Sequence, residues 1–244
     1  MATQLPHHTN GQLRVEMWSD FICPWCGIGE RRFKQALNDF PHRDNVRLSL
    51  RSYRLMPGSA AKPVERILRD KYELLPDEIA AGLKKLEAEA ATAGLTYNMA
   101  GSWGGDTMDG HRLVKLAKQS GREFALYHRL FMAAMSERQP LHDHAVLRNL
   151  ALETGLDAQD VDAVLGGGRY RDEVEADEAA MKRHGGRGVP FFIINDRHDY
   201  SGALAPDIFL NALHKAWEET ESTAAASVEG VPLCGPDGCI LPSA

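Results

Sequence analysis

The sequence predicts a mixed α/β fold in which a βαβ unit and a ββα unit lie on either side of a long helical insertion. Three observations support this prediction. Apolar stretches with strand character occur near the two ends of the chain, over 13–18, 46–54 and 190–195. Between 62 and 184, apolar residues recur at helical spacing instead. A Cys-x-x-Cys motif directly follows the first strand.

The first strand leads into Cys23-Pro24-Trp25-Cys26, and the residues after it predict a helix to about Asn38. A Cys-x-x-Cys motif between a strand and a helix indicates a redox site of the thioredoxin type. The start of a helix presents unpaired N–H groups and the positive end of the helix dipole, which favour a thiolate there. Pro24 suits the first helical turn, where its missing N–H removes no hydrogen bond. We therefore expect Cys23 to be the exposed, low-pKa attacking sulfur and Cys26 to be the resolving thiol.

The next segments complete the first unit and define the insertion. Residues 46–54 alternate apolar with polar or small side chains and predict a strand parallel to the first, in a right-handed βαβ unit. The insertion is predicted to hold about five helices, with Gly155 as a helix stop and Asp157 as the next N-cap. The glycine run 166–168 is predicted to end that helix, and a further helix is predicted over 170–182.

The C-terminal part returns to strand character. Residues 190–195 predict a strand and 199–202 the returning strand of a hairpin, followed by an amphipathic helix from about 206 to 217. Residues 218–229 are rich in Glu, Ser, Thr and Ala and predict a flexible linker. The predicted division is a thioredoxin-like domain in two parts, 13–61 and 185–220, an inserted helical domain, 62–184, and a linker with a C-terminal tail, 221–244.

Composition limits the classes of partner. The chain has 244 residues, 43% apolar and 25% charged, as in ordinary globular proteins of one large or two small domains. Its formal net charge of −6 gives no reason to expect binding to nucleic acid or an anionic membrane. The first ten residues contain no apolar signal-peptide core, and no stretch approaches the ~18 apolar residues of a membrane span, so we expect a cytoplasmic protein. In that compartment a pair of cysteines is more often catalytic or metal-binding than a structural disulfide.

Six short motifs, taken in order, resemble one family. They are WSDFICPWC at 18–26, IGERRF at 28–33, DGHRL at 109–113, GVPFF at 188–192, SGA at 201–203 and CGPDGC at 234–239. The chain resembles the DsbA-like thiol–disulfide oxidoreductases and, within them, the cytosolic FrnE group, for which the C-terminal CxxxxC is the most particular feature. The resemblance spans nearly the whole chain. It implies a thioredoxin-like fold with an inserted all-helical domain, and dithiol–disulfide exchange without an organic cofactor.

Two positions depart from the family pattern. Gly27 stands where a bulky aromatic residue is common, and Glu30 stands where a basic residue is usual. We expect the glycine to open space beside the motif and to loosen the first helical turn by about 0.5–1 kcal/mol relative to alanine. We expect the carboxylate of Glu30 to weaken the positive field on Cys23. The resemblance therefore supports the reaction type better than any particular redox potential.

The resemblance also implies roles for residues around the two sulfurs. Val189-Pro190 is expected to form a cis peptide bond beside Cys23, with the backbone of Val189 free to pair with an extended substrate peptide. Trp25 is expected to cover the disulfide and to offer client proteins an apolar contact. From its position three residues before Cys23, Asp20 is predicted either to cap the helix or tune the thiolate, or to serve as a simple turn or cap residue.

Three other polar residues are candidates for a supporting role. Glu16, in the first strand, could be the buried acid beside the resolving thiol. His111 and Arg112 begin an amphipathic helix whose counterpart in a related isomerase branch binds glutathione or substrate. For this chain we favour a capping or inter-domain role for these two residues.

The predicted function is thiol–disulfide exchange on protein or small-molecule thiols, glutathione included, with no cofactor and no metal. Reduced Cys23 attacks a disulfide to form a mixed disulfide, Cys26 resolves it, and the oxidised pair runs these steps in reverse on a dithiol. One alternative is a glutathione-dependent isomerase of the 2-hydroxychromene-2-carboxylate type, whose members carry a lone Ser or Cys in place of the pair. The other is a zinc protein that uses all four cysteines, with the tail docked on the active site.

Cys234 and Cys239 are predicted to form a second redox pair that serves Cys23 and Cys26. The segment CGPDGC places two cysteines around turn-forming residues, so the short loop can bring the sulfurs within disulfide distance. As a flexible coil, the 218–229 linker would span roughly 17–21 Å. That reach would raise the effective concentration of the tail at the active site. The alternative is a small structural disulfide that holds the C-terminus.

Overall fold

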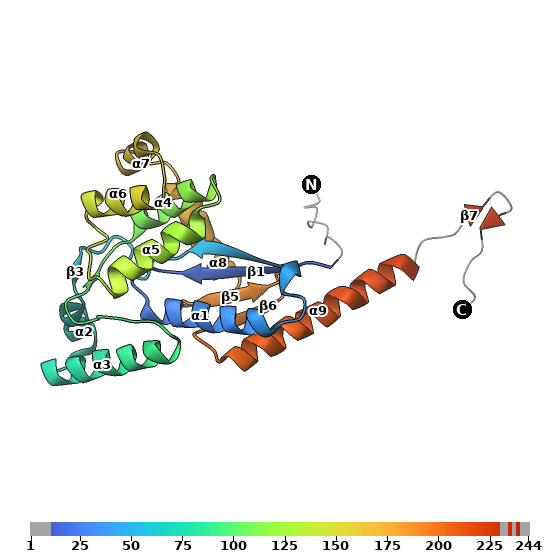
Figure 1. Ribbon diagram of the computed structural model, residues 1–244, viewed down its shortest axis with the longest axis horizontal. Coiled ribbons are helices and arrows are strands. Elements are labelled where there is room, and N and C mark those ends of the chain that lie inside the picture. Colours follow the sequence, from blue (N-terminus) through green and yellow to red (C-terminus); the bar gives the residue numbers. More distant parts are fainter. Residues whose placement is uncertain (1–10, 230–233, 236–237, 240–244) are drawn as a thin grey trace.

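Apolar alternation at the two ends of the chain builds one four-stranded sheet, with strand order β2-β1-β5-β6. The computed structural model describes residues 11–229, 234–235 and 238–239, with side chains through residue 222. The strands are β1 (Leu13–Ser19), β2 (Val46–Ser52), β3 (Lys62–Pro63), β4 (Trp103–Gly104), β5 (Phe191–Ile194), β6 (His198–Ser201), β7 (Cys234–Gly235) and β8 (Gly238–Cys239). Figure 1 shows the sheet at the centre of the molecule with helices around it.

The helices follow the order that the sequence predicts, with additions. They are α1 (Pro24–Asp39), the 3-10 turn η1 (Arg43–Asn45), α2 (Val64–Tyr72), α3 (Pro76–Thr92), α4 (Met108–Lys118), α5 (Glu123–Met135), α6 (His144–Glu153), α7 (Ala158–Leu165), α8 (Arg171–Arg183) and α9 (Pro206–Glu229). The predicted thioredoxin-like α/β fold is confirmed.

Strand β1 organises the sheet because it pairs on both sides. It runs parallel to β2 and antiparallel to β5, as the predicted βαβ and ββα units require. Successive side chains of a strand point to opposite faces. Met17 therefore lies on the face covered by α1 and α9, where the rings of Phe33 and Phe209 pack at right angles. Trp18 lies on the other face and packs with Met181 of α8.

The insertion contains more regular structure than the sequence suggests. Between residues 62 and 184 the structure has seven helices, α2 to α8, where about five were predicted, and the two-residue strands β3 and β4 pair there. The pattern of α2 was missed because none of its nine residues, all of them described, is fully buried. Asp157 caps α7 as predicted, accepting from the N–H groups of Gln159 and Asp160, and Gly155 has the positive φ of +81° expected at a helix stop. The division into domains stays a prediction.

The predicted flexible linker over 218–229 is wrong, because α9 continues as a helix to Glu229. The segment contains three consecutive alanines and lacks glycine and proline, so nothing in it stops a helix. Two hydroxyls also bond within the helix: Thr220 donates to the carbonyl of Ala216, and Ser222 donates to that of Glu218.

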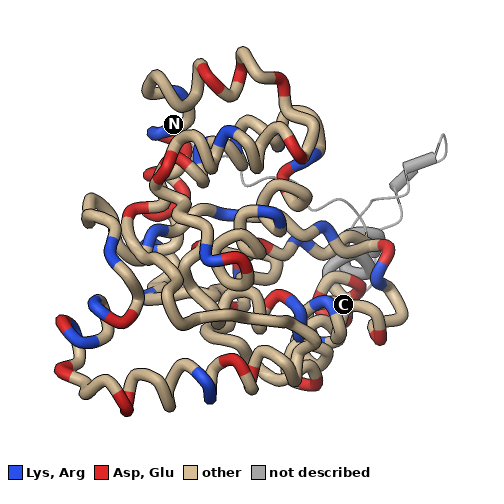
Figure 2. Tube along the Cα trace, turned by 60° about the vertical axis from the view of Figure 1, so that its left-hand side comes forward, with Lys and Arg blue, Asp and Glu red and all other residues tan. Residues whose placement is uncertain are grey.

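Lysine and arginine residues alternate with aspartate and glutamate residues over the drawn surface elements (Figure 2). The two signs are often paired directly, as in Arg148 with Asp162 at 2.6 Å and Arg129 with Glu153 at 2.6 Å. None of the described helices is both long and apolar enough to cross a lipid bilayer.

Two glycines let α1 lie close to its neighbours on both sides. A Cβ atom at Gly27 would meet Phe131 Cε1 of α5 at 2.5 Å and the hydroxyl of Tyr97 at 2.5 Å. A Cβ atom at Gly29 would meet Pro190 Cγ at 2.8 Å. Phe131 and Tyr97 occupy the position of a Cβ atom at Gly27, but a cavity of about 170 Å³ lined by Gly27, Glu30 and His128 lies beside them, so the expected space is present. These close approaches hold the start of α1 between the helical insertion and the loop before β5.

We expect Gly27→Ala to destabilise the protein even though alanine favours a helix. The added methyl group overpacks a buried contact, which costs about 1–3 kcal/mol, whereas the propensity gain is at most about 1 kcal/mol. The net loss of about 1–2 kcal/mol is measured as a lower urea midpoint.

Gly82 provides the matched control, because it lies inside α3, is exposed, and has nothing within 4 Å of an added Cβ atom. Gly82→Ala should stabilise the protein by about 0.5–1 kcal/mol. Equal stabilisation by both substitutions would show that α1 does not depend on the close approach at Gly27.

Candidate active site

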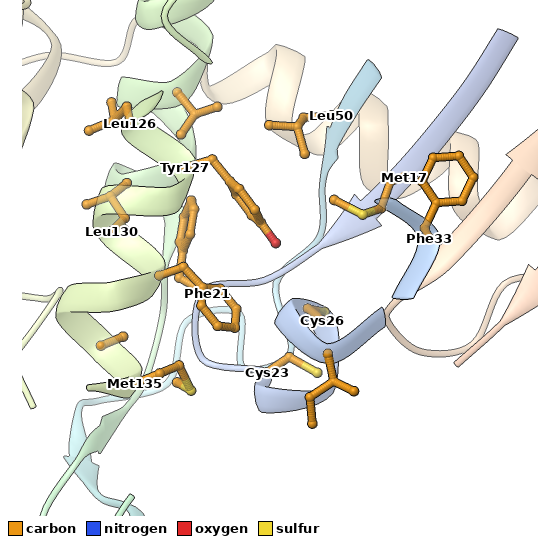
Figure 3. Close-up of a cluster of buried hydrophobic side chains, with 14 of the residues drawn as sticks. Met17, Phe21, Cys23, Cys26, Phe33, Leu50, Leu126, Tyr127, Leu130 and Met135 are labelled. Carbon is orange, nitrogen blue, oxygen red and sulfur yellow. The ribbon is translucent and has the colours of Figure 1, made fainter. Parts of the chain in front are cut away.

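The two sulfurs lie at the start of α1, where the chain leaves β1 and turns. The Cys23 N–H donates to the carbonyl of Asp20 at 3.1 Å, and the Cys26 N–H donates to that of Cys23 at 2.9 Å. Cys23 is the N-cap residue, and Pro24 stands in the first turn as predicted. Figure 3 shows Cys23 near Phe21 and Cys26 in the first turn of α1, and all three residues belong to one apolar cluster. Both cysteines are free thiols in the structure.

Accessibility distinguishes the two thiols, although neither is exposed. Cys23 is 5% exposed and Cys26 is 0% exposed. The expectation of an exposed Cys23 is therefore wrong, but Cys23 is the more accessible of the two thiols, as expected. The covering group is the loop before β5: the Cys23 thiol donates to the carbonyl oxygen of Val189 at 3.4 Å. The peptide bond between Val189 and Pro190 is cis, as predicted. This loop therefore covers the Cys23 sulfur on one side.

A groove of about 400 Å³ lies on that side. Its lining residues come from the loop before β5 and the end of β6, and they are Gly185, Arg187, Gly188, Val189, Pro190, Ser201 and Gly202. Most of these residues present backbone or small side chains, and Arg187 provides a positive charge. An extended chain could lie against the backbone of Val189 in this groove.

The Cys26 thiol is held in its neutral form by its surroundings. Burial raises its pKa well above the ordinary value, and the hydrogen bond and charge of the neighbouring Cys23 sulfur raise it further. The Ser19 hydroxyl and the backbone N–H of Asp20 act in the opposite direction, because they stabilise the thiolate form. Cys26 therefore becomes a nucleophile only with help from its neighbours.

Asp20 positions the turn through its backbone and its carboxylate. The described residues give α1 no side-chain cap, so the predicted capping role of Asp20 is wrong. One carboxylate oxygen instead accepts from the N–H of Leu55 at 2.7 Å. The other lies 3.6 Å from Nε2 of His111. Asp20 thus ties the turn after β1 to the segment after β2.

Glu16 does not lie beside Cys26, which corrects the candidate assignment. It points to the face of the sheet opposite Met17 and accepts a hydrogen bond from Arg51 Nε at 2.6 Å. Arg51 also binds Asp177 of α8 at 3.0 Å. The alternation of β1 explains the difference, because even-numbered residues of the strand face away from α1.

A buried carboxylate does lie near the thiols, but it comes from α1. Glu30 accepts from Nε2 of His128 at 2.7 Å and from Nζ of Lys34 at 2.7 Å. Burial raises the pKa of Glu30, but the hydrogen bond and charge of His128, together with Lys34, outweigh it and leave the pKa below its usual value. Glu30 was predicted to weaken the positive field on Cys23; its pairing with Lys34 and His128 limits that effect. The sequence signal was its place four residues after Cys26 and four before Lys34.

Exposed apolar side chains surround the motif. Trp25, between the two cysteines, is 44% exposed, so its ring is available to a partner. Leu55, whose N–H binds Asp20, is also exposed, and Trp103 lines the same small hollow as Ile22. These side chains form an apolar margin around the start of α1.

Arg112 has the capping role that the sequence favours. Its buried guanidinium donates to the carbonyl of Arg169 at 2.7 Å and to that of Gly167 at 2.5 Å, just beyond α7. It also binds Asp109 at 2.6 Å. His111 stacks on Phe21, with ring centroids 4.4 Å apart. Both residues therefore join elements of the fold.

Among the side chains that the structure describes, no three His, Cys, Asp or Glu residues gather as ligands for a metal ion. The side chains of Cys234 and Cys239 lie outside the described residues. Their backbones are register partners in the antiparallel pair β7–β8. The structure thus brings Cys23, Cys26 and Pro190 together and leaves the tail pair untested.

A thioredoxin-like sheet with two thiols at the start of α1 and a cis-proline beside them defines the class of protein. Residues 14–214 match the model of the DSBA-like thioredoxin domain, so the chain belongs to that family.

Three solved structures are similar over most of their length. A probable DsbA oxidoreductase from Streptomyces coelicolor is 40% identical, over 95% of this chain and 100% of that one, with a TM-score of 0.82. A 2-hydroxychromene-2-carboxylate isomerase is 13% identical, over 87% and 98% of the two chains, with a TM-score of 0.59. The cytosolic disulfide reductase DsbM from Pseudomonas aeruginosa with GSH is 19% identical, over 87% and 99%, with a TM-score of 0.56. The last two show the fold alone.

Proposed function

We propose that the protein is a cytoplasmic thiol–disulfide oxidoreductase of the FrnE group, with Cys23 as the attacking sulfur and Cys26 as the resolving one. The observation that carries the proposal is the pair of free thiols at the start of α1, of which only Cys23 keeps accessible surface. The positive end of the α1 dipole favours negative charge at its N-cap, where Cys23 stands.

The reaction follows from this order of access. The Cys23 thiolate attacks one sulfur of a substrate disulfide; a bond forms between Cys23 and that sulfur, and the other substrate sulfur leaves as a thiolate. The Cys26 thiolate then attacks Cys23 and releases the first substrate sulfur. The protein pair is oxidised and the substrate disulfide is reduced. In the reverse direction the oxidised pair accepts two electrons from a substrate dithiol.

Substrates of two kinds fit the surroundings of Cys23. The apolar margin of Trp25, Leu55 and Trp103 suits a protein client, whose extended segment can pair with the backbone of Val189. Arg187 in the groove suits a small thiol that carries a carboxylate, such as glutathione. The structure of DsbM contains GSH, which supports glutathione as a candidate for this chain.

The isomerase alternative is supported only by the shared fold, and that fold does not by itself require two cysteines. The zinc alternative needs ligands from the tail. Each is separated from the redox proposal by the variants below, since neither requires a disulfide between Cys23 and Cys26.

Cys23→Ser should abolish insulin reduction with glutathione as the electron donor, because the attacking sulfur is lost. Cys26→Ser should instead accumulate mixed disulfides through Cys23, because attack proceeds and resolution does not. The measurement is intact-protein mass spectrometry beside the turbidity assay. Alkylation at pH 6 that labels Cys26 faster than Cys23 would contradict the assignment of roles.

We also propose that Cys234 and Cys239 form a second redox pair. Opposite residues of an antiparallel pair have Cα atoms about 4.5–5.5 Å apart, within the range that a disulfide spans. The helical course of α9 to Glu229 changes the expected mode of transfer, because 12 helical residues form a rod of about 18 Å instead of a coil. Transfer of a disulfide from the tail of one molecule to the active site of another then competes with transfer within one molecule.

The test is a double variant, Cys234→Ser with Cys239→Ser, assayed separately for oxidation and reduction of substrate. We expect one of the two rates to fall several-fold, with the Cys23–Cys26 potential unchanged. A dependence of the wild-type transfer rate on protein concentration identifies transfer between chains. Wild-type rates in both directions would exclude the relay and leave the tail pair structural.

A further inference from the structure

The proposed reaction requires Cys26 to lose a proton that bulk water cannot reach. Its sulfur has 0% exposure, and burial raises its pKa well above the ordinary value. The resolving step needs the thiolate of this residue. A route for its proton must therefore pass through neighbouring groups.

Ser19 and Tyr127 supply two linked hydroxyls at this place. The Ser19 hydroxyl stabilises the thiolate form of Cys26 and shares a hydrogen bond of 2.7 Å with the Tyr127 hydroxyl. Both residues are buried. Figure 3 shows the ring of Tyr127 reaching from α5 with its hydroxyl directed to the junction of β1 and α1.

Ser19 and Tyr127 both line a small cavity whose lining includes neither Cys23 nor Cys26. The cavity has a volume of about 10 Å³, close to the smallest space that holds one water molecule. Ser19 and Tyr127 line it together with His111, Lys115 and Lys118. Lys118 is exposed, so the cavity lies between the hydroxyl pair and solvent.

We propose that Ser19 and Tyr127 form the route by which the proton leaves Cys26 during resolution of the mixed disulfide. The Cys26 S–H gives its proton to the Ser19 oxygen, while the Ser19 proton passes to Tyr127 and the Tyr127 proton passes to water in the cavity. The Cys26 electron pair then forms the bond to Cys23, the bond between Cys23 and the substrate sulfur breaks, and that sulfur leaves with its electron pair and takes a proton from solvent. Ser19 touches the reacting thiol, and Tyr127 acts through Ser19 as a positioning residue.

Two of the other titratable groups around this route are engaged elsewhere. Glu30 of α1 is held by His128 and Lys34, and the Tyr97 hydroxyl donates to the carbonyl of Pro24 at 3.0 Å. The remaining charged or titratable groups that face the route are Asp20 from the turn after β1, His111, Lys115 and Lys118 from α4, Arg51 from β2, Glu123 from α5 and Cys23 itself. Among the described residues, Oδ1 of Asp20 and Nε2 of His111 are buried without a hydrogen-bond partner. Burial, and then the charges of Glu30 and Cys26, raise the pKa of Tyr127, so its hydroxyl stays neutral and can receive one proton as it gives another.

The test is single-turnover reduction of a disulfide substrate by prereduced protein, with separate observation of mixed-disulfide formation and decay. Tyr127→Phe should slow decay at least tenfold at pH 7 and leave formation within about twofold. Ser19→Ala should have the same effect, and neither change adds volume to the core. The decay rate of both variants should rise with pH, because a larger fraction of Cys26 is then ionised before the attack and no longer needs the hydroxyl route. A structural role would lower both steps at every pH.

Tyr97→Phe is the matched control, because it removes a buried phenolic hydroxyl beside α1 that lies outside the route. We expect its decay rate and pH profile to match wild type within about twofold. Wild-type decay in Tyr127→Phe and Ser19→Ala at pH 7 would overturn the inference, as would an equal defect in Tyr97→Phe. If the proposed function itself is wrong, the wild-type protein will form no mixed disulfide at all, and this result differs from every outcome named above.

Discussion

The close packing of α1 at its first turn is the constraint on which the site depends. Gly27 brings the helix against Phe131, and Gly29 brings it against Pro190. These contacts fix the start of α1 between the helical insertion and the loop that carries Val189. As a result, both cysteines are buried in the hydrophobic core, and the Val189 carbonyl accepts a hydrogen bond from the Cys23 thiol.

This placement makes the chemistry of the two thiols unequal. Cys23 keeps a small exposed surface beside the carbonyl of Val189, whereas Cys26 is fully buried and interacts only with protein groups. The insertion therefore contributes to the surroundings of the site, because α5 supplies Tyr127 to the Ser19 hydroxyl and His128 to Glu30. Substitutions in the insertion should therefore slow resolution of the mixed disulfide more than they slow its formation.

The sequence was sufficient for features set by local patterns. Strand alternation, the Cys-x-x-Cys position and the Asp157 cap are properties of neighbouring residues, and the structure has each of them. The sequence was insufficient for features that depend on packing between segments far apart in the chain. The partners of Glu16 and Glu30, which are Arg51 for the first and His128 for the second, could not be predicted, since they depend on which way a strand faces and where a helix docks. The role of Gly27 needed Phe131, which is 104 residues away in the chain.

The measurement that tests this account most directly is a redox titration of the protein in glutathione buffers, read by alkylation and mass spectrometry of each cysteine. The account predicts that Cys23 and Cys26 change state together as one two-electron couple, with about 30 mV for each tenfold change in the equilibrium constant. It also predicts that the midpoint is independent of the tail cysteines. Separate titration of the two thiols, or a Cys23–glutathione adduct that never proceeds to the Cys23–Cys26 disulfide, would contradict it.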